Sequence, residues 1–171
     1  MLPVKSLLCL TATVAASSME QVIQSVSNIN SNVEKLTEKV NAWDGGLISA
    51  APQLLTLGLI SKALDSGVYH TGHLHTLLTS KESTTLLDHV NATLYVSNPI
   101  AVDAVLKKMD KYEKIGTTGT IAASLKKLLD GHGKFSANIV IRLPEEFLQR
   151  GVELSEHITL ALRKGILAFG G

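Results

Sequence analysis

Residues 47–63, LISAAPQLLTLGLISKA, concentrate the apolar character of the sequence, and we expect the other elements to pack around them. No residue between Asp44 and Lys62 carries a formal charge, and the apolar positions go nearly all round a helix. A membrane span needs roughly 20 predominantly apolar residues, whereas this stretch also contains serine, threonine, glutamine and Pro52. We therefore predict a buried helix, capped by Ser49 with Pro52 in its first turn, that neighbouring helices cover on several sides.

A second apolar pattern precedes this helix. It begins at Ser18, which has a capping-box spacing with Gln21, and continues at steps of four and three residues until Asp44-Gly45-Gly46. The apolar positions are Val22, Val26, Ile29, Val33, Leu36, Val40 and Trp43. A coiled coil is the alternative, but the glycines end the pattern after about three heptads. We predict an antiparallel bundle helix.

Local signals divide the chain after residue 63. An Asp-Ser-Gly sequence at 65–67 indicates a break or a weakening of the central helix, which leaves the status of the next segment open. Thr79 and Glu82 have the spacing of a second capping box and predict a new helix start. Asn98-Pro99 predicts a kink or a short loop, because proline lacks a backbone donor and clashes with the preceding turn.

Two further helices are predicted near the C-terminus. Apolar stripes run over residues 121–139 and 148–169, and Leu143-Pro144 separates them. No segment alternates between apolar and polar residues over the length of a strand. The sequence therefore predicts an all-α, single-domain bundle of five to six amphipathic helices around the apolar second helix.

The first residues have the composition of a secretory signal peptide. Lys5 precedes an apolar segment of about 11 residues, and small residues follow it. We predict a signal peptide over residues 1–16 and a mature domain over 17–171; an N-terminal membrane anchor or an ordinary first helix are the alternatives. A chain of 171 residues with 45% hydrophobic and 4% aromatic residues can bury an aliphatic core within one domain.

Cleavage after Ala16 would change the charge and the cysteine count. Loss of Lys5 brings the formal charge from +1 to zero, so no overall field would attract nucleic acid. The sole cysteine, Cys9, would also leave. A secreted protein without disulfides must obtain its stability from packing, which a domain of this size can supply.

Together these features resemble the fungal hydrophobic surface binding protein A family, which includes the cell-wall galactomannoproteins. The similarity lies in the order of parts: the leader, the stripe VIQSVSNINSNVEKLTEKVNAWDGG (22–46), the alanine- and leucine-rich second helix, the threonine-capped third, FSANIVIRLP (135–144) and VELSEHITLALRKGI (152–166). The resemblance implies a secreted helical domain that binds long-chain fatty acids or related lipids in an apolar cavity, or that adsorbs to hydrophobic surfaces.

The leading hypothesis is a secreted, non-enzymatic protein that sequesters long-chain fatty acids between its helices, outside the cell or in the cell wall. The alternative is a surface-active cell-wall or adhesion protein that adsorbs to hydrophobic surfaces or cell-wall polysaccharide and recruits partners. Small residues would leave room for a ligand: Ala50, Ala51, Gly58, Ala63, Ala122 and Ala123. The candidate cavity residues are Leu54, Leu57, Gly58, Leu125, Leu128, Phe135, Ser155, Ile158 and Leu162.

Other chemistry has weaker signals. His70, His73 and His75 lack the glutamate and the cysteines of common zinc sites, so we expect no metal site there. Residues 131–134, Gly-His-Gly-Lys, lack the earlier glycine and the following hydroxyl of a phosphate-binding loop, and no G-x-S-x-G elbow is present. We expect neither a catalytic site nor a cofactor.

Two kinds of polar residue remain as candidates. Asn91 begins the sole N-glycosylation sequon and is a candidate for modification if the chain is secreted. Ser124, Ser136 and Ser155 lie on or beside apolar stripes. Their hydroxyls would either meet a ligand carboxylate or donate to a backbone carbonyl one turn earlier, which is the commoner role of a helical serine.

Overall fold

The computed structural model describes the backbone of residues 4–171 and the side chains of residues 19–171. This part of the chain contains seven helices and no strand: α1 (Val4–Ala42), α2 (Leu47–Gly72), α3 (Ser80–Ala92), α4 (Leu94–Leu106), α5 (Met109–Lys114), α6 (Thr118–Val140) and α7 (Glu145–Ala168). The predicted all-α fold is confirmed. The predicted signal peptide, residues 1–16, lies outside the residues whose side chains are described, and its cleavage stays a prediction.

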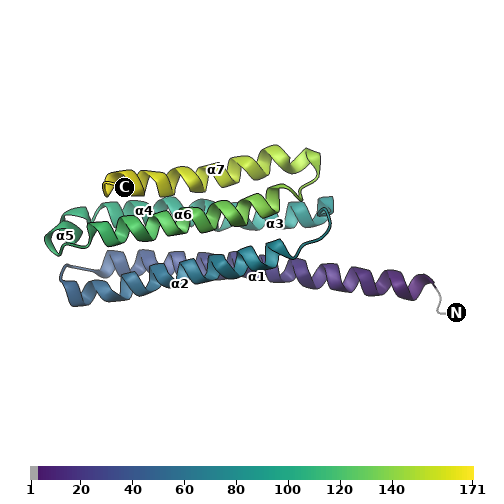
Figure 1. Cartoon of the computed structure of the whole chain (residues 1–171), viewed down its shortest axis with the longest axis horizontal. Helices are drawn as coiled ribbons and strands as arrows, with labels where there is room; N and C mark the ends of the chain where they lie inside the picture. The colour runs from purple at the N-terminus through teal and green to yellow at the C-terminus, as the bar shows by residue number, and fades with distance from the viewer. Residues whose placement is uncertain (1–3) are drawn as a thin grey trace.

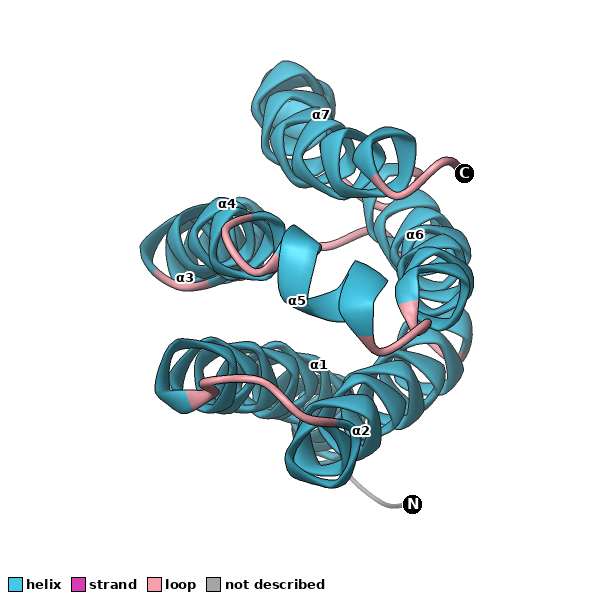
Figure 2. Cartoon of the chain, turned by 90° about the vertical axis from the view of Figure 1, so that its left-hand side faces the viewer, coloured by secondary structure: helices cyan, strands magenta, loops and turns pink. Residues whose placement is uncertain are grey.

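Five long rods pack as a closed ring, in which α3 and α4 follow one another as a single rod (Figures 1 and 2). The neighbouring pairs in contact are α1–α2, α2–α6, α6–α7, α7–α4 and α4–α1. Successive rods run in opposite directions, and the short α5 closes the end of the ring at which α1 ends. The apolar stripes of the rods face the axis of this ring and form its core.

The apolar stripe predicted for the first helix is buried throughout, from Val22 to Trp43. The predicted start at Ser18 is wrong for the chain of 171 residues, because α1 already begins at Val4. Leucine and alanine are frequent in residues 7–16 and favour the helical backbone. The helix therefore continues through the capping-box sequence rather than starting there.

The position of α2 differs from the expectation. It packs mainly against α1 and α6 and leaves one side to solvent, because a rod in a five-membered ring has only two direct neighbours. Its buried face includes the polar residues Gln53, Thr56, Ser61 and Thr71. Neighbouring helices thus cover α2 on two sides only, and it lies in the wall of the bundle.

The start of α2 also requires a correction. The helix begins at Leu47, after Gly46 with φ +95°, so Pro52 is the sixth helical residue and not part of the first turn. Ser49 does not cap the helix. Its Oγ donates to the carbonyl oxygen of Gly45 at 2.6 Å and accepts from the Trp43 indole Nε1 at 3.1 Å. The serine therefore ties the α1–α2 connection together.

The predicted break at 65–67 is not a helix end, since α2 continues to Gly72. Gly67 is required there by packing: a Cβ atom at this position would lie 2.9 Å from the Phe135 ring of α6. The glycine weakens the helix locally but allows α2 and α6 to approach closely.

The capping box at the start of α3 is confirmed, with reciprocal hydrogen bonds between Thr79 and Glu82. At Asn98-Pro99 the sequence predicts a kink or a short loop, and the structure has no loop there. The rod breaks at Thr93 instead, and α4 continues through Pro99. Asn98 Nδ2 donates to the carbonyl oxygen of Leu94 at 2.9 Å, which adds a side-chain link in the turn where proline removes a backbone donor.

Aromatic residues fill the end of the ring that α5 closes. Trp43 stacks on Tyr112 of α5 with ring centroids 4.6 Å apart, and Phe169 meets the edge of Tyr112 at 5.9 Å. The Tyr112 hydroxyl donates to Gln53 Oε1 of α2, and burial raises the pKa of Tyr112 well above its ordinary value. This end is therefore a packed plug.

Candidate functional site

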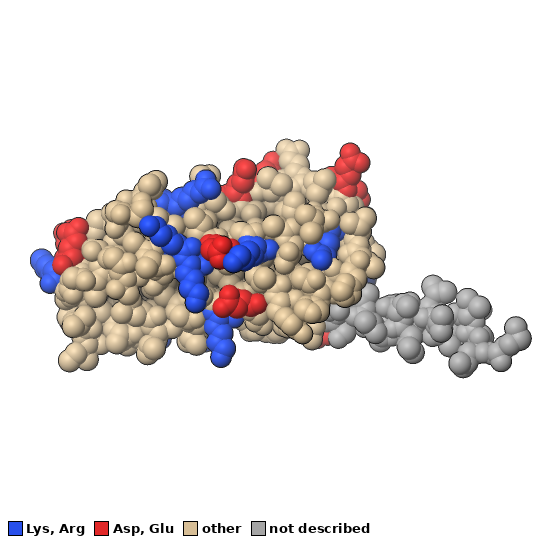
Figure 3. Space-filling view, viewed as in Figure 1, with Lys and Arg blue, Asp and Glu red and all other residues tan. Residues whose placement is uncertain are grey.

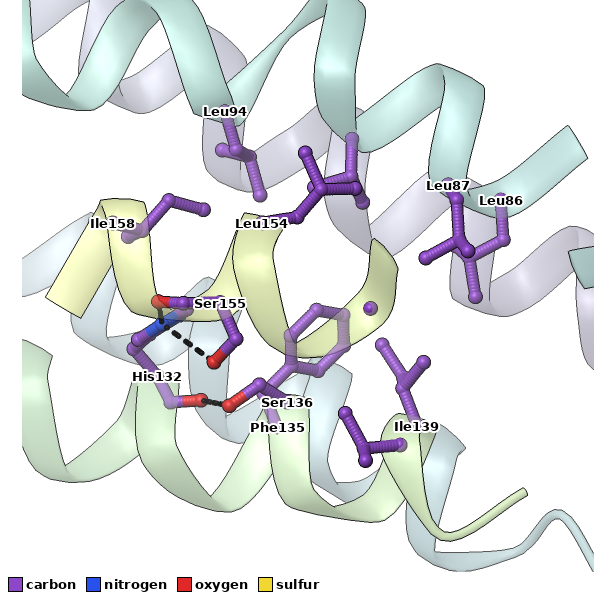
Figure 4. Close-up of a pocket in the computed structure, with 13 residues that line it drawn as sticks. Leu86, Leu87, Leu94, His132, Phe135, Ser136, Ile139, Leu154, Ser155 and Ile158 are labelled. Atoms are coloured by element: carbon purple, nitrogen blue, oxygen red, sulfur yellow. Dashed lines mark hydrogen bonds between the residues drawn. The ribbon is translucent and has the colours of Figure 1, made fainter. Parts of the chain in front are cut away.

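An apolar pocket lies between α3, α4, α6 and α7, and we call it the His132 pocket (Figure 4). Its volume is about 40 Å³. Its lining consists of Leu86, Leu87, Val90, Leu94, His132, Phe135, Ser136, Ile139, Val140, Gly151, Leu154, Ser155 and Ile158. Nine of these thirteen residues have apolar side chains and one is glycine, so the pocket suits an apolar ligand with one polar end.

His132, Ser136 and Ser155 supply the polar side chains of this pocket and lie close together in it. His132 Nε2 lies 3.0 Å from the backbone carbonyl oxygen of Ser155 and 3.5 Å from its Oγ. Because a carbonyl oxygen only accepts, Nε2 carries the proton of the neutral ring and Nδ1 is left as an acceptor. Ser136 Oγ donates to the carbonyl oxygen of His132 at 2.9 Å.

The environment of His132 favours the neutral imidazole. The side chain is buried, and burial lowers the pKa of His132 below its ordinary value of 6.5. The hydrogen bond to the Ser155 carbonyl acts in the opposite direction but is the weaker effect. A neutral, fixed imidazole thus forms the polar end of an otherwise apolar pocket.

A second pocket of about 20 Å³ lies on the axis of the ring, and we call it the axial pocket. All five rods contribute to it: Val33, Leu36, Ile60, Asn98, Ala101, Val102, Val105, Leu125, Leu128 and Leu162. In three helices a residue of the axial pocket lies one turn from a residue of the His132 pocket. These pairs are Asn98 with Leu94, Leu128 with His132, and Leu162 with Ile158. Along α7 the two linings extend from Gly151 to Leu162, a rise of about 17 Å.

The candidate cavity residues from the sequence fall into three groups. Phe135, Ser155 and Ile158 line the His132 pocket, and Leu125, Leu128 and Leu162 line the axial pocket. Leu54, Leu57 and Gly58 of α2 line neither: Leu57 is buried, Leu54 is half-buried and Gly58 is exposed. Among the small residues expected to leave room, Ala51 and Ala123 are likewise exposed.

Sequence reasoning missed His132 as a site residue. It lies on the apolar stripe of α6 between Leu128 and Phe135, and a polar residue at such a position was the available signal. The leucines of α3 were also missed, because nothing local indicates that α3 faces α7. Ser124 is half-buried, donates to the Thr120 carbonyl and lines neither pocket.

A separate apolar feature lies on the outside of the molecule. The outer α2 face consists of Leu47, Ile48, Ala51, Pro52, Leu55, Gly58 and Leu59, all exposed. Ile48 is 91% and Leu55 70% exposed, and Figure 3 shows no charged residue over this end of α2, at the lower left. Among the described residues, α2 alone is long enough and apolar enough in composition to cross a membrane, and its packing against α1 and α6 fits a bundle helix.

The remaining polar candidates are spread over the surface. His73 and His75 are exposed, and His70 Nδ1 lies 3.0 Å from Ser25 Oγ of α1. Within the part of the chain whose side chains are described, no three histidine, cysteine or acidic side chains converge on a metal position. Asn91 is exposed at the end of α3.

Fold and pockets together define an all-α bundle protein with an apolar interior site between its helices. The chain belongs to the family of hydrophobic surface binding protein A, whose description matches residues 19–140. The resemblance noted in the sequence is thereby confirmed. No curated protein matches the sequence.

Several solved structures share the fold. Ligand-binding domain 2 of the Penicillium marneffei MP1 protein, solved in complex with multiple arachidonic acids, is 25% identical with a TM-score of 0.82, over 91% of this chain and 96% of that one. Domain 1 of the same protein, complexed with arachidonic acids, is 24% identical with a TM-score of 0.80, over 85% and 94%. AFMP4P in complex with palmitic acid is 16% identical with a TM-score of 0.83, over 88% and 99%.

Proposed function

We propose that this protein binds long-chain fatty acids between its helices and releases them unchanged. The observation that carries the proposal is the His132 pocket, which is lined mainly by apolar side chains and has the polar side chains of His132, Ser136 and Ser155 close together at one position. Family membership and the fatty acids bound by proteins of the same fold support it. No residue in the proposal performs chemistry on the ligand.

Binding requires the rods to move apart. Pockets of about 40 and 20 Å³ are far smaller than the roughly 300–1,000 Å³ of ordinary small-molecule sites. Because the two pockets are one helical turn apart, separation of α4, α6 and α7 would join them into one channel along the axis. We propose that the acyl chain fills this channel, with its carboxyl group at His132 and Ser155.

The free energies favour moderate affinity. Burial of about 15 methylene-sized groups at about 0.8 kcal/mol each gives a gross gain of about 12 kcal/mol. Association costs an estimated 4–15 kcal/mol, and separation of the helices adds to that cost. We expect dissociation constants in the micromolar range that fall with chain length until the channel is full.

A titration of the delipidated protein with fatty acids of 10 to 20 carbons tests the proposal. Ile158→Trp, which fills the His132 pocket, should abolish saturable binding, whereas Leu160→Trp on the exposed side of α7 should leave it intact. Native mass spectrometry of the purified protein would show which lipid is retained. Binding that occurs only above each lipid's micelle concentration would contradict an internal site.

The outer α2 face supports a second function, adsorption to hydrophobic surfaces. Isolated apolar residues are normal on a surface, but contiguous uncharged patches indicate contact with another apolar phase. Leu55→Ser with Leu59→Ser should reduce adsorption to polystyrene beads. The matched control, Leu160→Ser with Leu167→Ser on α7, removes the same number of exposed leucines and should adsorb normally.

We further propose that the protein acts outside the cell or in the cell wall, as a mature domain of residues 17–171 that contacts hydrophobic surfaces or wall polysaccharide. The leader composition and the family support this location. N-terminal sequencing of protein from culture medium should begin near Ser17. A glycosidase-sensitive mass shift that Asn91→Gln removes would place an N-glycan on the exposed end of α3.

A further inference from the structure

The polar side chains of the His132 pocket offer an unequal set of donors and acceptors. The Nε2 proton of His132 is directed to the Ser155 carbonyl at 3.0 Å, and the Ser136 hydroxyl donates to the His132 carbonyl at 2.9 Å. These hydrogen bonds leave unused the Nδ1 lone pair of His132 and the hydrogen of the Ser155 hydroxyl. The Nδ1 lone pair accepts a hydrogen bond, and the Ser155 hydroxyl donates one.

A carboxylate matches only half of this set. It has two acceptor oxygens, so it can accept from the Ser155 hydroxyl, but it cannot donate to Nδ1. A carboxyl group that carries a proton matches both groups. The same proton count results if the proton moves to Nδ1 and leaves an imidazolium–carboxylate pair, because the pair shares one proton.

Building on the proposed function, we propose that each fatty acid bound in the His132 pocket takes up one proton from solution, which its carboxyl group shares with His132. At neutral pH the free ligand is ionised and the buried imidazole is neutral, so the complex holds one proton more than the separated partners. A long-chain alcohol, whose hydroxyl both donates and accepts, needs no such proton.

Among residues 19–171, whose side chains the structure describes, no charged side chain lines the pocket and could replace His132 in this role. Burial and the Ser155 carbonyl are the causes that shift its pKa, with no contribution from a charged neighbour. The titratable groups on the surrounding helices are exposed, or partly exposed and bonded or stacked elsewhere. They include Asp65 of α2, Asp88 and His89 of α3, Asp103 of α4, Asp130 and Lys134 of α6, and Arg150, Glu153, Glu156, His157 and Lys164 of α7.

Calorimetry measures the proton directly. The protein is titrated at pH 7.5 with dodecanoic acid or with 1-dodecanol, each in two buffers that differ in ionisation enthalpy. We expect uptake of about one proton per acid and none per alcohol. The affinity for the acid should fall about tenfold per pH unit above neutrality, while the affinity for the alcohol stays constant.

Two variants assign the proton. His132→Gln keeps an amide that can donate to the Ser155 carbonyl but cannot be protonated, so the acid that this variant still binds should take up no proton. His157→Gln is the matched control on the outside of α7 and should behave as wild type. If His132→Gln fails to fold by circular dichroism, the nitrogen-15 shift of His132 Nδ1 in the wild-type protein decides. A proton shared with the acid should move this shift further toward the imidazolium value than the hydrogen bond from the alcohol does.

The outcomes separate this inference from the function on which it rests. If neither acid nor alcohol binds, the proposed function fails. If both bind but the acid takes up no proton, or if uptake is unchanged in His132→Gln, the lipid site stands and the proton-sharing role of His132 is wrong.

Discussion

Leu55 and Leu57 are two residues apart in α2 and face opposite environments, one 70% exposed and the other 2%. Leu57→Asp should lower the free energy of unfolding by several kcal/mol, out of about 5–15 kcal/mol for a domain, because it places an unpaired charge in the apolar core. Leu55→Asp should change it by less than about 0.5 kcal/mol. Urea titrations followed by circular dichroism measure both, and equal stability of the two variants would contradict the assigned orientation of α2.

His132 also predicts how stability depends on pH. Its pKa is lowered in the folded state and rises to about 6.5 on unfolding, so the unfolded chain binds more protons between these two values. Its contribution to stability is therefore complete above pH 6.5 and decreases as the pH falls below it. The melting temperature should fall between pH 7 and 5.5, and His132→Gln should reduce that fall; an unchanged slope would contradict the burial of a neutral imidazole.

The sequence predicts which residues of a helix face the interior, because this depends only on their spacing along that helix. Phe135, Ser155 and Ile158 were selected because they lie on stripes, and all three line one pocket. His132 lies on the same stripe, but the sequence gives it no site role, because the Gly-His-Gly-Lys pattern around it does not match a phosphate-binding loop. The Ser155 carbonyl that fixes its tautomer is 23 residues away, and a local pattern cannot indicate that contact.

At the scale of the helix, two glycines provide a matched comparison. A Cβ atom at Gly133 of α6 would meet nothing within 4 Å, whereas one at Gly67 of α2 would lie 2.9 Å from the Phe135 ring. Gly133→Ala should therefore raise the free energy of unfolding by about 0.5–1 kcal/mol. Gly67→Ala should lower it and disturb the α2–α6 contact, and differential scanning calorimetry compares the two. A stabilising Gly67→Ala would contradict the close approach.

Helix ends followed the sequence where a local hydrogen bond decides them. The Thr79–Glu82 capping box is such a case, because both partners belong to one turn. The rod formed by α3 and α4 is the opposite case: proline at position 99 predicts a break there, yet the break lies at Thr93. Packing of the following residues, such as Val102, against the ring outweighs the hydrogen bond that Pro99 removes.

For the bundle as a whole, ligand binding should widen the cross-section and also raise the free energy of unfolding. A fatty acid at 100 times its dissociation constant adds about 2.7 kcal/mol to the free energy of unfolding. The same ligand must part α4, α6 and α7, so a scattering profile should show a wider cross-section for the lipid complex than for the free protein. A higher melting temperature without any change in dimensions would contradict the proposed channel.

The order of the rods around the axis could not be predicted from the sequence. The composition of α2 suggests a central helix, since its apolar residues go nearly all round it. In the ring it is a wall helix that buries Gln53, Thr56 and Ser61 and exposes leucines. Which side of such a helix faces inward depends on partners such as Lys39, whose ammonium donates to Thr56 Oγ1 at 2.8 Å, and these come from other helices.

The chain has one tryptophan, and its location gives the molecule an internal optical reporter. Trp43 is buried against Tyr112 in the aromatic plug, at the opposite end of the bundle from the leucines of α3 that line the His132 pocket. Its emission in the free protein should be that of a shielded indole. A spectral change on addition of a fatty acid would therefore report that separation of the rods has reached the plug, whereas constant emission would confine the movement to the far half of the bundle.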